Sequence, residues 1–247
     1  IINASKFSIF FIDENQKVTT KDIGSIDEII HRAEKYDSTV KKTDLVSQFR
    51  CNWSDGYIQL LNNTLQIWEY TDIDKSDLNF DIEIFDDPNE LRDKLREKNS
   101  NNKARMVAWY CYDWDVKYKR WQRDIKLENW FKAKRNLEWD KIWAINPESF
   151  EEVWCIHTAQ WLEFDYVWVF IWKDLRYDSQ SWKIIADRNQ ISKDDKTSWI
   201  RLKSTSDDLA ERLIKNTYKT LLTRGQKWCY IYCEDKDTRE YFRKMMR

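Results

Sequence analysis

The chain has 247 residues, of which 42% are hydrophobic and 34% are charged, and its formal net charge is -1. No apolar run approaches the roughly 20 residues that span a bilayer, and the first residues lack the cleavage site of a signal peptide. The near-neutral balance gives no general support for nucleic-acid binding, so any basic groove must be local. The five cysteines form no CxxC pair, which favours buried, reduced thiols in a cytoplasmic protein over disulfides or a metal site.

Glycine and tryptophan depart furthest from ordinary composition. The chain has 3 glycines and 15 tryptophans, where about 7% glycine, roughly 17 residues, is usual. An α/β protein needs glycine at strand-to-helix turns and at close backbone approaches. Several tryptophans stand where such turns are expected, among them Trp53, Trp161 and Trp172. The sequence alone does not tell why tryptophan stands at positions where glycine is expected.

Apolar periodicity, capping residues and turn residues predict alternating strands and helices. Ser25 and Glu28 form a capping box, and Pro88 suits the first position of a helix. The predicted strands are 7–12, 45–50, 80–85, 104–112, 141–145, 153–156, 166–172, 182–186 and 227–233. The predicted helices are 25–36, 56–68, 88–98, 208–222 and 238–247. Several strands are nearly continuous apolar runs, which predicts an α/β fold with a mostly parallel sheet flanked by helices.

The stretch 153–172, VWCIHTAQWLEFDYVWVFIW, organises the rest of the chain. It is a buried strand, a polar loop and a second buried strand. Loops that follow the strands of an open α/β sheet are where such folds bind ligands. His157, Thr158, Gln160 and Glu163 are therefore the first candidates for a functional site.

A strand followed by His-Thr-Ala-Gln-x-Leu-Glu-Phe-Asp resembles motif V of superfamily 1 helicases. The wider chain is similar to the Schlafen-group-3-like DNA/RNA helicase domain, a family of helicase-related motors. The resemblance implies that His157, Thr158 and Gln160 contact nucleic acid. It also implies that Glu163 accepts hydrogen bonds from the ribose of a nucleotide or positions the loop.

Three shorter patterns match further helicase motifs in the same order along the chain. Asp13 and Gln16 follow the strand at 7–12 as in motif III, where the glutamine senses the γ-phosphate. Arg50, at the end of the strand at 45–50, resembles the phosphate-binding arginine of motif IV. Arg224, in Leu-Leu-Thr-Arg-Gly, resembles the arginine finger of motif VI. Without the resemblance, the sequence favours a solvated loop at 13–16, a surface arginine at position 50 and an arginine at a helix end at position 224.

The resemblance also implies a division of the chain. Residues 1–24 would end a first RecA-like domain, and 25–247 would form the second RecA-like domain, with insertions around 113–140 and 174–205. Because the sequence has no GxxxxGK[ST] and no recognisable Walker B strand, the P-loop domain would lie N-terminal to this chain. The four polar loops would converge on one edge of the sheet, as half of a nucleotide site.

The function that follows is part of an ATP-dependent DNA or RNA helicase or translocase. ATP and Mg²⁺ would bind only in the complete motor. Its partner would be single-stranded DNA or RNA, and no membrane association is expected. This chain alone should not hydrolyse ATP. The alternative is a non-catalytic module that binds nucleic acid or protein and has a degenerate helicase fold. A nuclease is a weaker alternative, because no carboxylate–lysine cluster stands out.

Overall fold

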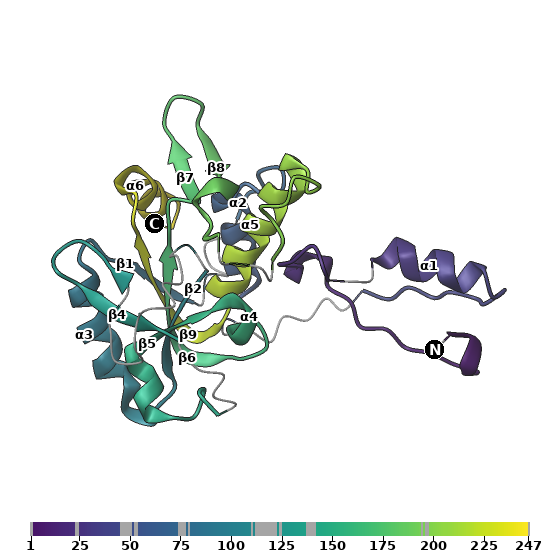
Figure 1. The fold of residues 1–247 in the computed structure, drawn as a ribbon, viewed down its shortest axis with the longest axis horizontal. Helices are drawn as coiled ribbons and strands as arrows, with labels where there is room; N and C mark the ends of the chain where they lie inside the picture. Colours follow the sequence, from purple (N-terminus) through teal and green to yellow (C-terminus); the bar gives the residue numbers. More distant parts are fainter. Residues whose placement is uncertain are drawn as a thin grey trace.

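The computed structural model describes residues 2–22, 25–44, 51, 54–73, 78, 80–109, 111, 123, 125–136, 142–193, 195 and 198–246. The strand predicted at 45–50, together with Arg50, lies outside these residues. Most of the described chain forms an α/β body, from which the N-terminal segment and α1 project (Figure 1).

A seven-stranded sheet forms the centre of the described chain, in the order β1-β9-β6-β2-β5-β4-β3. Its strands are β1 (Asp81–Ile84), β2 (Ala104–Ala108), β3 (Ile125–Lys126), β4 (Lys132–Arg135), β5 (Glu152–Cys155), β6 (Phe164–Ile171) and β9 (Gly225–Cys233). Neighbouring strands pair in parallel, except for the antiparallel pair of β3 and β4. The predicted α/β class with a mostly parallel sheet is confirmed.

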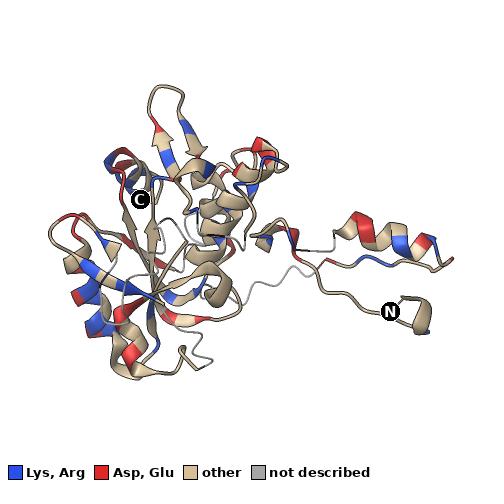
Figure 2. Cartoon of the chain, viewed as in Figure 1, with Lys and Arg blue, Asp and Glu red and all other residues tan. Residues whose placement is uncertain are grey.

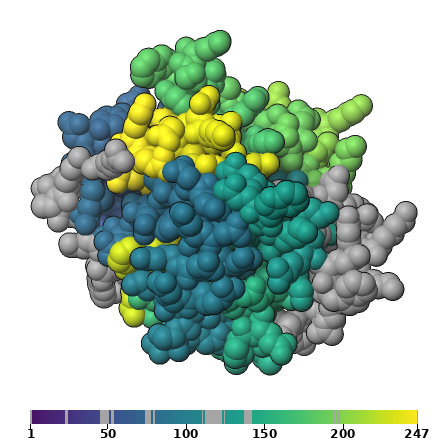
Figure 3. Space-filling model, turned by 90° about the vertical axis from the view of Figure 1, so that its left-hand side faces the viewer, coloured from purple at the N-terminus to yellow at the C-terminus, as the bar shows by residue number. Residues whose placement is uncertain are grey.

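Helices cover both faces of this sheet. They are α2 (Asp55–Thr64), α3 (Pro88–Lys98), α4 (Ile156–Ala159), α5 (Asp207–Leu222) and α6 (Lys236–Met245), while α1 (Ile26–Glu34) stands apart. In Figure 1, α3 lies on one side of the sheet and α2, α4 and α5 lie on the other. Figure 3 views the face that carries α3 and α6, with α6 in yellow above α3. Parallel strands need this cover because both of their faces are apolar.

The capping residues explain where several helices begin. The hydroxyl of Ser25 accepts from the backbone N–H of Glu28 and starts α1 as predicted. Ser54 caps α2 in the same way, and Pro88 occupies the first turn of α3. α5 begins at Asp207 and is capped by Ser206, so it starts one residue before the predicted 208. Both residues are good helix starters, so the sequence fixes this boundary only to within one position.

Aromatic side chains on β6 build much of the core. Trp168, Phe170 and Trp172 alternate along the strand and therefore share one face. Their rings stack in turn, with centroids 4.2 Å apart for the first pair and 4.9 Å for the second. All three are buried, and burial of such side chains contributes about 1.5–3 kcal/mol each. Among the described residues, the buried indole N–H of Trp168 has no hydrogen-bond partner, which offsets part of this gain.

The strand predicted at 7–12 is wrong. Residues 5–13 form no regular secondary structure, and Phe7 and Phe11 are 80% and 82% exposed. An apolar run becomes a strand only where another strand can accept its backbone hydrogen bonds. In the described chain the segment runs along the projecting arm, away from the sheet (Figure 1).

Two other expectations also change. Residues 142–145 form turns rather than a strand, and the guanidinium of Arg105 binds the carbonyl of Ala144 at 2.8 Å. The last strand, β9, begins at Gly225, two residues before the predicted start at 227. A Cβ atom there would lie 2.5 Å from the carbonyl oxygen of Trp228, so the position requires glycine because of close backbone approach.

The long polar segment 174–205 contains more structure than its composition indicates. β7 (Leu175–Asp178) and β8 (Lys183–Ala186) pair as an antiparallel hairpin that stands above the body in Figure 1. Only the second of these strands was predicted.

Along α1 and α3, Lys and Arg alternate with Asp and Glu (Figure 2), so neither helix offers a basic stripe.

Candidate functional site

The loop between β5 and β6 is the centre of the candidate site. It begins with the short helix α4 at the carboxyl end of β5 and reaches the amino end of β6 at Phe164. The hydroxyl of Thr158 donates to the carbonyl of Cys155 at 2.9 Å, and Gln160 N–H donates to the carbonyl of Ile156 at 2.9 Å. The loop is therefore a compact turn of helix and not an open polar loop.

Arg224 holds this loop from the neighbouring segment. Its side chain is fully buried between α5 and β9. The guanidinium donates to the carbonyl of Gln160 at 2.5 Å, to the carbonyl of Thr220 at 2.9 Å and to the hydroxyl of Thr223 at 3.3 Å. Planar guanidinium donors suit such fixed acceptors, so Arg224 ties the end of α5 to the loop.

The far end of the loop lies beside the start of β9. Phe164 pairs with Gly225 in the sheet, so the residues that precede them, Glu163 and Arg224, lie close together in space. Glu163 is exposed, and its carboxylate accepts from the side-chain amide of Gln226 at 2.5 Å. Glu163 and Arg224 thus lie together at the amino ends of β6 and β9.

The segment that resembles motif III packs against the middle of α5. Asp13 starts a 3-10 helix at Glu14–Gln16, and its carboxylate accepts from the amide of Gln16 at 2.7 Å. The side chain of Asn216 donates to the carbonyl of Lys17 at 3.2 Å. Burial lowers the pKa of the nearby Lys219, and the charge of Asp13 opposes that shift. Asp13 and Gln16 thus lie against the helix that leads to Arg224.

Arg50 lies outside the described residues, but its neighbours approach the same place. The thiol of Cys51 lies 3.8 Å from the carbonyl of Thr223, which precedes Arg224. The hydroxyl of Tyr57, on α2, donates to the carbonyl of Leu222 at 2.9 Å. The residues after the predicted motif IV therefore contact the end of α5.

His157 faces a different set of side chains. Its Nε2 atom lies 3.7 Å from the carboxylate of Asp195, an electrostatic contact longer than a hydrogen bond. Asp195 accepts from the indole N–H of Trp109 at 3.1 Å and from the hydroxyl of Ser198 at 2.6 Å. Burial alone would raise the pKa of Asp195. The interactions with His157, Ser198 and Trp109 outweigh burial and lower this pKa to about 2.

A second buried carboxylate lies after β6 and has the opposite character. Asp174 is fully buried and accepts from the hydroxyl of Tyr218 at 2.5 Å. Burial raises the pKa of Asp174 to about 7, although hydrogen bonds from Tyr218 and Cys111 oppose the shift. The same burial raises the pKa of Tyr218 well above its ordinary value. Such a pair can hold a proton near neutral pH.

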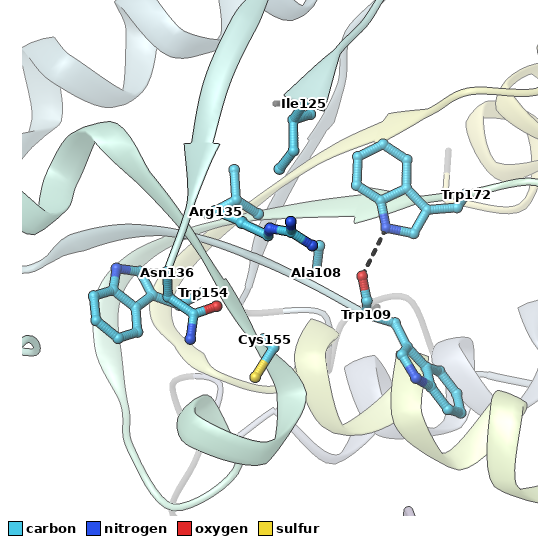
Figure 4. A pocket seen from close by; sticks show the side chains of 9 residues that line it. Ala108, Trp109, Ile125, Arg135, Asn136, Trp154, Cys155 and Trp172 are labelled. Carbon is cyan, nitrogen blue, oxygen red and sulfur yellow. Dashed lines mark hydrogen bonds between the residues drawn. The ribbon is translucent and has the colours of Figure 1, made fainter. Parts of the chain in front are cut away.

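A small cavity lies where β2, β4 and β5 end (Figure 4). Trp109, Trp154 and Trp172 line it together with Arg135 and Asn136. In Figure 4 the guanidinium of Arg135 points between these indoles. The cavity is about 20 Å³, which holds roughly one water molecule and no larger ligand. The indoles therefore fill the crevice where open α/β sheets bind ligands.

Five of the predicted site residues fall into two groups, while Asp13 and Gln16 lie against the middle of α5 and Arg50 lies outside the described residues. Glu163, Arg224 and the carbonyl of Gln160 meet at the amino ends of β6 and β9. His157, with Thr158 beside it, lies at the carboxyl end of β5. The expectation that all the polar loops converge on one edge of the sheet is wrong, because the loop after β5 crosses from one edge to the other before β6 begins.

Several residues around the candidate site were not predicted. Asn216 and Lys219 lie on α5, in the two turns before Arg224. Polar residues in a largely buried helix are unusual, and this was the sequence signal that could have marked them. Asp195 lies in a long polar segment without a motif, so only the fold could bring it to His157. In the described part of the chain, no cluster of three or more His, Cys, Asp or Glu residues could hold a metal ion. No described helix is long and apolar enough to cross a membrane.

Comparison with known proteins identifies relatives of the chain. A family model, Schlafen group 3, DNA/RNA helicase domain, matches residues 1–235. The chain is 26% identical over 204 residues to the uncharacterized protein YPL245W of Saccharomyces cerevisiae. The match covers 76% of this chain and 43% of that protein, so the chain spans less than half of the length of this relative. No solved structure matches the chain.

Proposed function

The chain belongs to the Schlafen group 3 DNA/RNA helicase domain family, and we propose that it is the second RecA-like domain of an ATP-dependent helicase or translocase. Residues 1–24 would belong to the first RecA-like domain. The observation that carries the proposal is the bond from Arg224 to the carbonyl of Gln160, which joins the motif VI arginine to the motif V loop. Two motifs that are distant in sequence are thereby coupled through one side chain.

In this proposal the chain supplies one side of a nucleotide site, and a P-loop domain supplies the other. Asp13, Gln16 and Glu163 are exposed or half-exposed, so their polar atoms can reach a ligand. Mg²⁺ would be held by the P-loop partner, since the described residues offer no carboxylate cluster for it. ATP would supply the free energy for movement along the strand when its γ-phosphate is cleaved.

Arg224 does not fit the γ-phosphate in the arrangement described here. Its guanidinium is fully buried and donates to two carbonyls and a hydroxyl of its own chain. In our proposal it acts as a positioning residue that fixes the loop 156–163. Contact with a phosphate would require it to release Gln160, and that release would in turn free the loop. Arg50 would then be the second arginine toward the nucleotide.

The proposal places single-stranded DNA or RNA against the motif V loop, through His157, Thr158 and Gln160. Gln160 offers the sharpest test, because the Gln160→Ala variant keeps the main-chain carbonyl that Arg224 binds. We expect this variant to bind labelled single-stranded DNA or RNA about threefold to tenfold more weakly in fluorescence anisotropy, the loss of one hydrogen bond. Gln180→Ala, in the exposed loop of the β7–β8 hairpin, is the matched control.

Three measurements test the proposal and its alternative: binding by the Gln160 variant, ATP turnover, and binding in the presence of nucleotide and a P-loop domain. Equal affinities for the wild type and the Gln160 variant would contradict the proposed contact. ATP turnover by this chain without a P-loop partner would contradict the proposed division of the site. The alternative, a non-catalytic binding module, draws support from the buried, fully engaged side chain of Arg224. Its signature would be binding that stays unchanged when nucleotide and a P-loop domain are added.

A further inference from the structure

Three tryptophans have a backbone conformation that belongs to glycine. Trp130, Trp182 and Trp199 have φ angles of 60°, 59° and 57°. The left-handed region brings the Cβ atom of an L-residue too close to its own carbonyl, whereas glycine enters this region freely. Bulky residues with such angles are rare outliers. The other non-glycine residues of the described chain in this region are of two kinds. Asp37, Asn102 and Asn129 are of the types that tolerate it, whereas Cys51 and Gln66 are not.

Trp130 lies in the turn between β3 and β4. Phe131 N–H donates to the carbonyl of Glu128 at 3.2 Å, which closes a four-residue turn. Asn129 and Trp130 are its two central residues, and both have positive φ angles. This is the type I′ hairpin turn, for which Asn-Gly is the preferred pair. The indole of Trp130 is 91% exposed, so packing does not compensate for the strain.

Trp182 is the last residue of the loop between β7 and β8. Lys183 follows it and pairs with Asp178, so the chain must reverse within four residues. The amide of Gln66 donates to the carbonyl of Trp182 at 3.0 Å, which holds this backbone in place. The indole itself is 75% exposed. The main-chain carbonyl of residue 182 therefore contributes a contact to the fold, while its side chain lies mostly in solvent.

Trp199 closes a turn in the segment before α5. Leu202 N–H donates to its carbonyl at 3.2 Å, and the hydroxyl of Thr205 donates to the same carbonyl at 3.1 Å. The side chain is 43% exposed, with the ammonium of Lys21 at 4.0 Å from the ring centre. An exposed cation–π contact is a small gain beside the strain of the left-handed backbone.

We propose that the protein carries glycine at positions 130, 182 and 199 when its own source organism makes it. A codon that the organism decodes as glycine, but that is translated as tryptophan in this sequence, accounts for these three positions. It also accounts for the overall composition of 15 tryptophans and 3 glycines. The proposal is independent of the helicase function, because it rests on backbone angles, exposure and composition.

Paired substitutions separate backbone strain from loss of the indole. Trp182→Gly relieves the strain, whereas Trp182→Ala removes the same indole and keeps the Cβ atom. We expect the glycine variant to melt about 2–4 °C above the alanine variant. The same pair at Trp130 should behave alike. Trp68 is the matched control, since it is 60% exposed and its φ angle is not positive. There, glycine should melt at or below alanine.

A second measurement tests the decoding directly. Trypsin should release residues 177–183, Tyr-Asp-Ser-Gln-Ser-Trp-Lys, from the unfolded protein. Mass spectrometry of this peptide from the organism's own protein should give the mass for glycine at position 182. The mass for tryptophan overturns the proposal, whatever the melting temperatures are. Glycine variants that melt no higher than their alanine partners at both 130 and 182 overturn the backbone argument.

Discussion

Arg224 and Gln160 are joined by a hydrogen bond of 2.5 Å from the guanidinium to the main-chain carbonyl. The carbonyl of Arg224 also accepts from the N–H of Phe164 at 2.9 Å. One residue thus fixes the loop at two points, just before β6 begins. Because both contacts involve backbone atoms of the loop, they do not depend on the loop's side chains.

Loss of the Arg224 side chain should destabilise the whole body. Arg224→Ala leaves the carbonyls of Gln160 and Thr220 without these charged donors in a buried place. We expect a loss of about 2–4 kcal/mol in the free energy of unfolding, measured by urea denaturation. The free energy of unfolding of Arg224→Lys should lie between those of the wild type and Arg224→Ala, since an ammonium cannot reproduce the planar donor set.

Arg212 provides the control for this experiment. It lies on α5 like the residues that lead to Arg224, but it is exposed. Arg212→Ala should change the free energy of unfolding by no more than about 0.5 kcal/mol. Similar losses for both variants would mean that the hydrogen bonds of Arg224 add little to stability, and the coupling of the two motifs would lose its physical basis.

Asp174 should make the stability of the protein depend on pH. Its pKa is raised to about 7 by burial, from an ordinary value of 3.8. The folded state therefore holds a proton that the unfolded state releases. Stability conferred by this proton is present below about pH 4 and is lost as pH rises to about 7, by a few kcal/mol in total.

Asp174→Asn removes this titration and keeps an oxygen that can accept from Tyr218. The variant should gain stability over the wild type at pH 8, and the gain should shrink toward pH 5. Urea denaturation at both values measures the difference. Asp72→Asn, on an exposed loop residue, is the control and should show no such pH-dependent gain. A gain of equal size at both pH values would contradict the raised pKa.

The sequence predicted β1, β2, β5, β6 and β9 but neither β3 nor β4, which lie in the segment 113–140. Strands that are buried on both faces are the easiest to predict, because they are nearly continuous apolar runs. The runs that became β2, β6 and β9 are almost wholly apolar, and each lies in the core. The start of α1 was also predicted, since Ser25 caps the backbone N–H of Glu28, three residues further on. Such signals are local and do not depend on the rest of the fold.

Contacts between residues far apart in sequence could not be predicted in the same way. The segment 7–12 has the composition of a strand, but composition does not tell whether a neighbouring strand exists to pair with it. Asp195 meets His157 and Trp109 across a long separation in sequence. The order of the candidate residues was readable from the motifs. Their separation into two groups depends on the path of the loop 156–163 across the sheet.

The exposed apolar segment near the N-terminus gives a prediction about self-association. Phe7, Ile9 and Phe11 are 80%, 66% and 82% exposed, and short apolar segments of this kind associate through their backbones. Phe7→Ser with Phe11→Ser should reduce self-association in sedimentation experiments and leave the melting temperature unchanged. A lower melting temperature would show that the segment packs on the body, in contradiction to its exposure.

Trp161 should obstruct the loop at the candidate nucleic-acid contact. Its indole is 81% exposed and stands between Gln160 and Glu163. If the proposed function is correct, Trp161→Gly lets the strand approach the backbone of the loop and strengthens binding of labelled single-stranded DNA or RNA. Because the indole is not buried, its removal should change the free energy of unfolding by about 1 kcal/mol or less. Trp68→Gly, at another exposed indole, should leave the affinity unchanged. Weaker binding by the Trp161 variant, with stability preserved, would mean that the indole stacks on bases and does not block them.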